Sequence, residues 1–464
     1  MVRATMCNRW LSSRRSGAWN GGVGVVTIAA CGVLLGSVPA RADSANIRPY
    51  LVGARAAGMG GAATALADDG AGPYYNPEGI AFALASSLSL SASVYGLVSG
   101  TQKDGLSTGH DFTFSDINTF PVSTSAVFKW GPRAEPDGAP VNALAVSVFV
   151  PESLVIDDRQ TSNVELHGVV SQQTEFRTMS EQTIWAGMTY ARRFGRLGLG
   201  VSGYVLIGTS TASVDYNGMN SAYPSDFFIV SHRTDQTVVG LVGAFGARYD
   251  VSDHLKLGLS VFTQEAGIYQ DRRFFFRDAY ASEDIGVAPG SVAINQGGLH
   301  ASPTLPWRIQ LGAAWVTGPW TFAGDAMFLL PLDVHDDADR ASEGLDQHIK
   351  RNLVVNGSVG AEYVVRGRFP VRAGFFTDFA ASPSPHDDSG NNPNTANYEH
   401  VNRYGGSLSI GYWTEHTATD VGTIISYGSG QTIRRDAVES FLVEHVTNMT
   451  NRFAYVFLAS SYIF

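Results

Sequence analysis

The nine residues His254–Phe262, HLKLGLSVF, alternate strictly between apolar residues and small or polar ones. In an extended chain, one face would carry Leu255, Leu257, Leu259 and Val261. The opposite face would carry Lys256, Gly258 and Ser260. Side chains of a β-strand point alternately to opposite faces, so a period of two residues predicts a strand with one apolar face.

The same alternation recurs over most of the chain. Clear examples are LGLGVSGYVLIG at 197–208, WRIQLGAAW at 307–315, NLVVNGSVGAEY at 352–363 and VRAGFFTDF at 371–379. With weaker segments they predict fourteen strands, at 86–98, 121–130, 141–151, 181–194, 196–210, 236–250, 254–266, 307–317, 319–330, 352–365, 368–379, 404–415, 419–428 and 452–464. No amphipathic helical pattern of comparable length competes with them, so the predicted fold class is all-β.

The links between the predicted strands alternate in length. Short links include 194–196, 249–254, 317–319 and 365–368, and seven long polar ones lie at 99–120, 152–180, 211–235, 267–306, 331–351, 380–403 and 429–451. Outer-membrane barrels have this arrangement, because their periplasmic turns are tight and their outer loops are long. The sequence therefore predicts a transmembrane antiparallel β-barrel of about fourteen strands. The segment RRFFFRD at 272–278 is assigned to the fourth long loop, since a further strand would make the number odd.

The first 42 residues have the pattern of a signal peptide that is removed on export. Arginines without any acidic residue precede an uncharged run at 21–38, and Ala40-Arg41-Ala42 resembles a cleavage site. A membrane anchor, a lipoprotein site at Ile28–Cys31 and a twin-arginine signal at Arg14-Arg15 are alternatives that fit less well.

Export would leave a chain without cysteine and with a more negative charge. Cys7 and Cys31 both lie in the leader, so no disulfide framework is expected. The leader holds 5 of the 32 basic residues and none of the 42 acidic ones, so its removal moves the formal charge from −10 to −15. That charge disfavours nucleic acid as a partner. After residue 42 no apolar run is long enough for a transmembrane helix, so a membrane-spanning chain must form a closed barrel.

Aromatic residues support the same prediction. Six tryptophans follow the leader, and all lie within or at the ends of predicted strands: Trp130, Trp185, Trp307, Trp315, Trp320 and Trp413. They predict an aromatic belt at the lipid–water boundary, with packing in a core as the alternative. The segment FAYVFLASSYIF at 453–464 ends in Phe464 and resembles the closing strand that the barrel-insertion machinery of Gram-negative bacteria captures by strand pairing.

The sequence contains only weak matches to nucleotide-binding, metal-binding or catalytic motifs. GMGGAA at 58–63 fits the glycine spacing of a dinucleotide site, but it lacks the preceding buried strand and the following helix that such a site requires. His335-Asp336-Asp337 and His386-Asp387-Asp388 could bind a cation, yet without further spaced ligands they are better explained as solvated loop charge. No nucleophile–base pair stands out. We therefore expect no enzyme activity, no catalytic residue, no cofactor and no metal site.

The stretch GARAAGMGGAATALADDGAGPYYNPEGI at 53–80 resembles the N-terminal segment of the FadL/TodX-type outer-membrane transporters of long-chain fatty acids and hydrocarbons. Those proteins typically begin with a GxRxxGMGGAxxAxADDxxxxxxNPAG-like pattern. The matching positions are Gly53, Arg55, Gly58, Met59, Gly60, Gly61, Ala62, Ala67, Asp68, Asp69, Asn76, Pro77 and Gly79. Glu78 departs from the alanine that usually follows Asn-Pro in this pattern.

The resemblance implies three parts: a cleaved signal peptide at 1–42, an N-terminal hatch or plug at 43–84 inside the lumen, and a transmembrane barrel at 85–464 with seven long extracellular loops. The implied hatch and gating residues are Gly58, Gly60, Gly61, Asp68, Asp69, Asn76, Pro77 and Gly79. Arg55 and the aspartate pair could bind one another or wall residues such as Arg308 and Arg372. Alternatively, these three arginines could meet a ligand carboxylate. A lumen of fourteen strands is too wide for side chains alone to fill, and small residues let a plug approach the wall closely.

The implied function is passive uptake of hydrophobic small molecules across a Gram-negative outer membrane, with fatty acids first and hydrocarbons second. The implied partners are the ligand, outer-membrane lipids and lipopolysaccharide, and the barrel-insertion machinery, and the chain is expected to be a monomer. A static plug is the alternative to a moving hatch. A protein-export or surface-assembly shuttle and a general diffusion porin are alternative functions.

Overall fold

The structure is a computed structural model of the chain. It describes residues 46, 50–107, 109–118, 122–133, 139–166, 169–220, 227–282, 287–301, 305–337, 345, 347–386, 399–435 and 444–464. The predicted signal peptide and the pair Asp387-Asp388 lie outside these residues. Among the described residues, the helices are all too short to cross a membrane.

Seventeen strand segments form one antiparallel sheet that closes on itself, because β1 (Ser87–Ser107) pairs with β19 (Glu444–Ile463). Three barrel strands are interrupted. Both β2 (His110–Asn118) and β3 (Val122–Arg133) pair with β1, and both β8 (Leu255–Phe262) and β9 (Ala266–Ser282) pair with β7 (Phe227–Asp250). The third is β10 (Val287–Leu299) with β11 (Arg308–Thr317), which pair with β9 and β8. With each interrupted strand counted once, the barrel has fourteen strands, as predicted.

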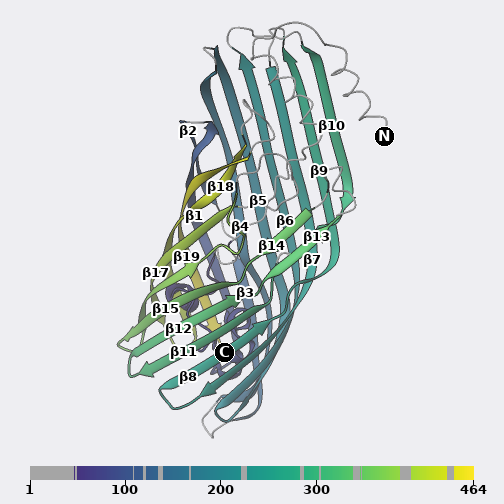
Figure 1. Cartoon of the computed structure of the whole chain (residues 1–464). Helices are drawn as coiled ribbons and strands as arrows, with labels where there is room; N and C mark the ends of the chain where they lie inside the picture. Colours follow the sequence, from purple (N-terminus) through teal and green to yellow (C-terminus); the bar gives the residue numbers. More distant parts are fainter. Residues whose placement is uncertain are drawn as a thin grey trace.

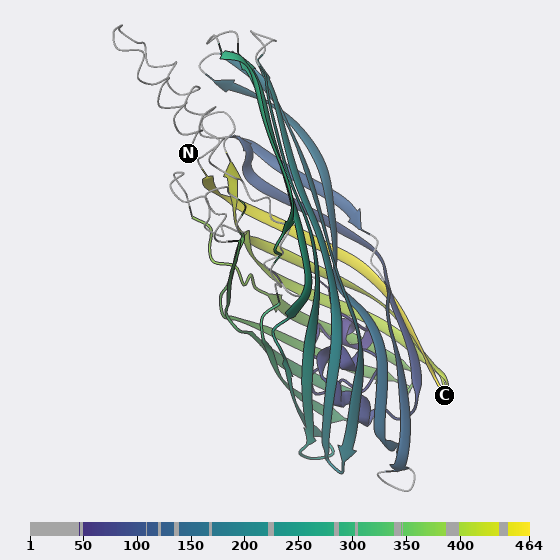
Figure 2. The ribbon, with the colours of Figure 1, turned by 90° about the vertical axis from the view of Figure 1, so that its right-hand side faces the viewer.

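The wall is much taller on one side than on the other (Figures 1 and 2). The tall side contains β4 (Pro140–Leu166), β5 (Val169–Phe194), β6 (Leu197–Asn220) and β7, together with β9 and β10. The remaining wall strands are β12 (Trp320–Leu329), β15 (Val354–Val365), β16 (Phe369–Asp378), β17 (His400–Trp413) and β18 (Thr417–Arg435). A separate hairpin of β13 (Leu332–Asp336) and β14 (Gln347–Arg351) lies between β12 and β15 in the chain.

The strands continue far into segments that the sequence predicted as long loops. For example, β4 and β5 pair from Asn142↔Arg192 to Leu166↔Val169, so most of 152–180 is strand. RRFFFRD was also assigned wrongly, because it lies within β9, where Phe274 and Phe276 pack in a cluster with Val230. The segment was excluded because a further strand would have made the number of strands odd. It adds no strand, because β9 continues the barrel strand that β8 begins. Polar residues conceal such extensions, since a strand beyond the bilayer has water on its outer face and needs no apolar alternation.

The outer wall carries the apolar residues of the alternating pattern. Leu257 is 45% exposed and Leu259 is 36% exposed, whereas Gly258 and Ser260, which alternate with them, are buried. This arrangement is the reverse of that in a soluble protein and is typical of a wall that faces lipid. Four of the six tryptophans, Trp130, Trp307, Trp315 and Trp320, are exposed on it. The belt prediction is wrong for the other two, because Trp185 and Trp413 line internal cavities.

The described residues 50–86, which precede the first strand, lie inside the barrel (Figure 2). It contains three short helices: α3 (Ala54–Gly58), α4 (Gly72–Tyr75) and the 3₁₀ helix η1 (Pro77–Phe82). Most of its residues are buried, and its apolar side chains join those of the wall in shared clusters. We refer to residues 50–86 as the hatch.

Candidate functional site

The hatch is bound to the wall by hydrogen bonds from many strands. The amide N–H groups of Ala63 and Thr64 each donate to Asp325 Oδ2 on β12 at 2.8 Å. The Tyr204 hydroxyl on β6 donates to the carbonyl of Pro73 at 2.7 Å, and the Ser260 hydroxyl on β8 donates to the carbonyl of Tyr75 at 2.8 Å. These bonds satisfy backbone groups that the short helices leave unpaired.

Small residues of the hatch allow its backbone to lie directly on the wall. Gly60 has φ +66°, and a Cβ at this position would lie 2.7 Å from the amide nitrogen of Phe375 on β16. Its own N–H donates to Ser407 Oγ on β17 at 3.0 Å. Gly61 also has a positive φ, and Gly58 lies against Ser409 and Arg372. The predicted glycines therefore mark close contacts with the wall.

The Asn76-Pro77 pair links two parts of the hatch to the wall. The Asn76 Nδ2 group donates to the carbonyl of Thr64 at 2.8 Å and to the carbonyl of Ala247 on β7 at 3.2 Å. Pro77 then begins η1, and a Cβ on Gly79 would overlap the carbonyl of Ala67. The side chain of Asn76 thus bonds a backbone group twelve residues earlier in the chain, instead of closing only a local turn.

Glu78, which departs from the expected pattern, is fully buried. Its carboxyl oxygens make no hydrogen bond within the described part of the chain. It occupies space left by Gly198 and Gly200 of β6. Burial raises the pKa of Glu78 well above its usual value, against the opposing effect of Arg248. The carboxyl is therefore favoured in its neutral form.

A chain of ion pairs joins the hatch to three wall strands. Arg55 lies 2.9 Å from Asp68 Oδ1 and 2.9 Å from Glu362 Oε1 of β15. Glu362 Oε2 accepts at 2.6 Å from Arg372 of β16, which also pairs with Asp420 of β18. We call these five residues the charge chain. The structure therefore brings Arg55, Asp68 and Arg372 together, as the sequence allowed.

Two further predicted charges have different surroundings. Asp69 accepts from the Ala71 N–H at 2.9 Å, and burial together with Asp68 raises its pKa. Arg308 is separate from the charge chain. Its guanidinium lies 3.8 Å from the centre of the Phe262 ring and donates to the carbonyl of Tyr74 at 3.2 Å.

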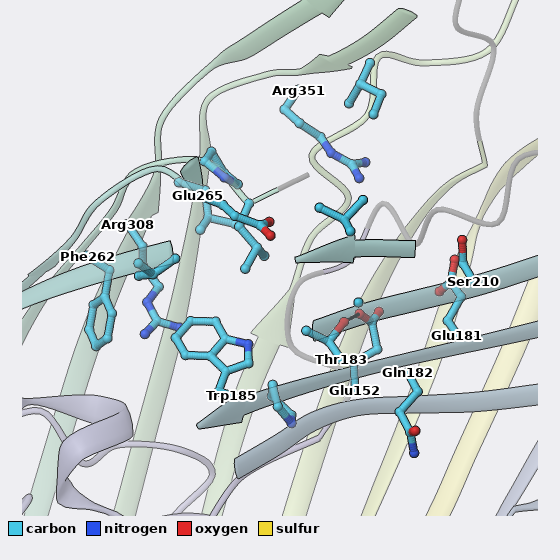
Figure 3. A pocket seen from close by; sticks show the side chains of 18 of the residues that line it. Glu152, Glu181, Gln182, Thr183, Trp185, Ser210, Phe262, Glu265, Arg308 and Arg351 are labelled. Atoms are coloured by element: carbon cyan, nitrogen blue, oxygen red, sulfur yellow. Dashed lines mark hydrogen bonds between the residues drawn. The ribbon is translucent and has the colours of Figure 1, made fainter. Parts of the chain in front are cut away.

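The upper cavity lies on the side of the hatch toward the β13–β14 hairpin and has a volume of about 120 Å³. Tyr74 of the hatch contributes an aromatic ring to its lining. The wall contributes the rings of Trp185 and Phe262, with Arg308 beside them (Figure 3). The remaining charged lining residues are Glu152, Glu181, Glu265 and Arg351.

The lower cavity lies on the other side of the hatch and has a volume of about 410 Å³. Hatch residues 52–55, 68–71 and 82–85 line it, together with hydroxyl residues of β1, β3 and β19 such as Ser89, Ser125 and Ser461. Arg55, Asp68, Asp69 and Arg372 are at its edge, whereas Arg308 lines the upper cavity.

Several residues of the site carried no usable signal in the sequence. Trp185, Phe262 and Glu362 come from three different strands, and only the register of those strands brings them to the hatch. Asn76, Pro77 and Gly79 are absent from the described lining of both cavities, and their contacts are within the hatch and with β7.

The part of the chain that the structure describes contains no cluster of three or more side chains that could hold a metal ion, and it includes His335-Asp336-Asp337 but only His386 of the second motif. The His335 ring stacks on His348, with ring centres 5.0 Å apart. Asp337 pairs with His300 at 2.9 Å and with Arg272 at 3.2 Å, so it is not simply solvated loop charge. Its hydrogen bond raises the pKa of His300.

The closed barrel with an internal hatch is similar to solved structures over nearly its whole length. A FadL homologue of Pseudomonas aeruginosa matches with a TM-score of 0.58 and 14% identity, covering 90% of this chain and 100% of that one. The toluene transporter TodX of Pseudomonas putida matches with a TM-score of 0.56 and 14% identity, covering 90% and 99%. The toluene transporter TbuX of Ralstonia pickettii has a TM-score of 0.53 and 12% identity, with 89% and 98% covered.

These likenesses establish the fold, and the predicted barrel with its hatch is confirmed. Neither a family model nor a curated protein matches the sequence.

Proposed function

We propose that this chain is a passive channel in the outer membrane of a Gram-negative bacterium that admits hydrophobic small molecules past its N-terminal hatch. The observation that carries the proposal is the upper cavity, where aromatic rings from the hatch and the wall enclose a small space inside a barrel with an apolar outer face. The shared fold with toluene transporters supports it. A general diffusion pore would not need its lumen filled by a buried segment.

Uncharged hydrocarbons of one ring are the cargo that the cavity suits best. Its volume of about 120 Å³ is close to the roughly 150 Å³ of a protein cavity that accepts benzene. Its charged lining residues are three glutamates and two arginines, an excess of negative charge that disfavours a carboxylate. Long-chain fatty acids are therefore second to hydrocarbons in this proposal.

Gating by movement within the hatch is the second part of the proposal. The hatch consists of helices of four to six residues joined by glycine-rich links, so small rearrangements need not disturb the wall. The residues that would control it are Gly58, Gly60, Gly61, Asp68, Asp69, Asn76, Pro77 and Gly79, of which Gly58, Gly60, Asp68, Asn76 and Pro77 contact the wall. The partners of the outer wall would be membrane lipids and lipopolysaccharide, and β19 with Phe464 would engage the insertion machinery of a monomeric barrel.

Uptake measurements test the proposal directly. The chain is expressed in a Gram-negative host whose own fatty acid transporter gene is deleted, and uptake of labelled toluene and labelled oleate is compared with that of the empty vector. We expect faster toluene uptake and a smaller gain for oleate. If neither compound enters faster than with the vector, the proposed function is wrong.

Tryptophan fluorescence tests binding at the upper cavity. With purified protein, toluene should change the emission of Trp185, which lines the cavity. Trp185→Phe should abolish the change, whereas Trp130→Phe should preserve it, because Trp130 is 45% exposed on the outer wall. An equal change in both variants would place the ligand elsewhere.

A further inference from the structure

We infer that the Tyr74 side chain is the gate between the upper and lower cavities, so that a ligand passes where its ring contacts Phe149. This inference rests on the proposed function and locates the moving part of the hatch. Tyr74 lines the upper cavity and Phe149 lines the lower one, and their ring centres are 5.7 Å apart in an edge-on contact. At this point the two cavities are separated by the contact between the Tyr74 and Phe149 rings.

On the wall side, few residues separate the lining of the upper cavity from that of the lower cavity. Along β4, Phe149 lines the lower cavity, while Pro151 and Glu152 already line the upper one. The pairing of β4 with β5 is irregular in the same place, with a register shift between Phe149 and Glu152. Both cavities therefore meet the wall within a few residues of one strand.

On the hatch side, too, few residues separate the linings of the two cavities. Ala71 lines the lower cavity and Tyr74 lines the upper one, and the Tyr74 N–H donates to the Ala71 carbonyl at 3.0 Å. One helical turn thus separates the two spaces. The Tyr74 ring also contacts Trp185, with ring centres 5.6 Å apart, so it lies over the directly paired residues Phe149 of β4 and Trp185 of β5.

Rotation of this ring requires less rearrangement than displacement of the hatch. The ring is packed against Phe149, Trp185 and Tyr75, and Arg308 lies 5.2 Å from its centre. Moving the backbone here would instead break the hydrogen bonds that Tyr204, Arg308 and Ser260 donate to the carbonyls of residues 73–75. A side-chain gate also sets a size limit, because the opening is at most the space that the ring vacates.

The test compares uptake of two uncharged hydrocarbons of different width, toluene and naphthalene, in the same cells. Tyr74→Ala should raise the ratio of naphthalene to toluene uptake about tenfold, a change typical of altered pocket size. Phe149→Ala, which opens the same contact from the wall, should act in the same direction. Tyr74→Phe should retain the wild-type ratio. Because each ratio is measured within one variant, the amount of folded protein cancels.

Tyr50→Ala is the matched control. Tyr50 is a buried tyrosine of the hatch that packs on Tyr455 at a ring distance of 5.3 Å, and it lines neither cavity among the described residues. It should leave the ratio unchanged. If wild-type cells take up toluene but the ratio is the same in Tyr74→Ala, Phe149→Ala and wild type, the gate is elsewhere. If wild-type cells take up no toluene, the proposed function itself fails.

Discussion

Arg55 of the hatch lies 2.9 Å from Glu362 of the wall, and the other oxygen of that carboxylate accepts from Arg372. Glu362 is thus shared between a cation of the plug and a cation of the barrel. Its side chain is only 2% exposed, whereas each guanidinium also pairs with an aspartate, Asp68 or Asp420. Glu362 therefore connects the hatch electrostatically to β15 and β16.

Glu362→Gln should destabilise the protein strongly. Arg55 keeps Asp68 and Arg372 keeps Asp420, but each loses a hydrogen bond to a charged group, which typically contributes about 1.5–3 kcal/mol. The free energy of unfolding in urea, measured on protein in detergent, checks this. Asp111→Asn serves as the control, since it breaks the exposed Lys103–Asp111 pair and should leave the urea midpoint unchanged. Equal effects of the two substitutions would contradict the role given to Glu362.

Gly60→Ala should destabilise the hatch through both its backbone and its packing. The residue has φ +66°, and its Cβ would lie 2.7 Å from a wall amide nitrogen. A left-handed non-glycine residue costs about 1–2 kcal/mol and overpacking adds about 1–3 kcal/mol, so the melting temperature should fall. Gly203→Ala is the control, because the space around that Cβ is open. A melting temperature that falls equally in both variants would exclude the contact as the cause.

Glu78→Gln should change the dependence of stability on pH. The pKa of Glu78 is raised in the folded state, mainly by burial, so the folded protein binds this proton more tightly than the unfolded chain does. Its contribution is fully present below the ordinary glutamate pKa of about 4.3 and is lost as the pH rises through the folded value. The variant should therefore match the wild type near pH 4 and exceed it at neutral pH. Melting curves at both pH values check this, and a difference that shrinks as pH rises would refute it.

Arg308→Gln should separate the two classes of cargo. The guanidinium lines the upper cavity and lies on the Phe262 ring, where it can meet a carboxylate but offers little to a hydrocarbon. Oleate binding should weaken about tenfold, in line with about 1.5–3 kcal/mol for a hydrogen bond to a charged group, while toluene binding should change less than about twofold. Titration followed by Trp185 emission gives both values. Equal losses for the two ligands would mean that Arg308 shapes the cavity rather than its charge selectivity.

The wall strands could be predicted because a barrel with an apolar outer face requires apolar and polar residues to alternate. Leu257 and Leu259 are exposed on that outer face and Gly258 and Ser260 are buried, so the sequence shows which residues of the strand point outward. Beyond the bilayer this constraint disappears. Residues such as Asp157 and Thr178 pair within a regular β4–β5 ladder, yet both are polar, and the sequence therefore indicated a loop.

The site was only partly accessible to the same reasoning. Gly60 and Asn76 were identified as hatch residues through a motif, and their contacts with the wall explain why those residue types are there. Asp68 was foreseen as a partner of Arg55, but the wall partner was not, because Glu362 is 307 residues away in the chain and reaches Arg55 only through the register of β15. Glu78 was noticed as an oddity, but its burial depends on two glycines of β6 that have no sequence connection to it.

The short strands also fix the depth at which the upper cavity lies. β11 and β12 have 10 residues each and end together at the Arg308↔Leu329 pair, both members of which line that cavity. Ten residues at about 3.3 Å, tilted by about 45°, span roughly 23 Å, close to the ~25 Å apolar band of such barrels. In the proposed outer-membrane orientation, with the short turns on the periplasmic side, the cavity is level with the outer boundary of the hydrocarbon. A compound arriving from outside would then reach the cavity before it enters the hydrocarbon layer.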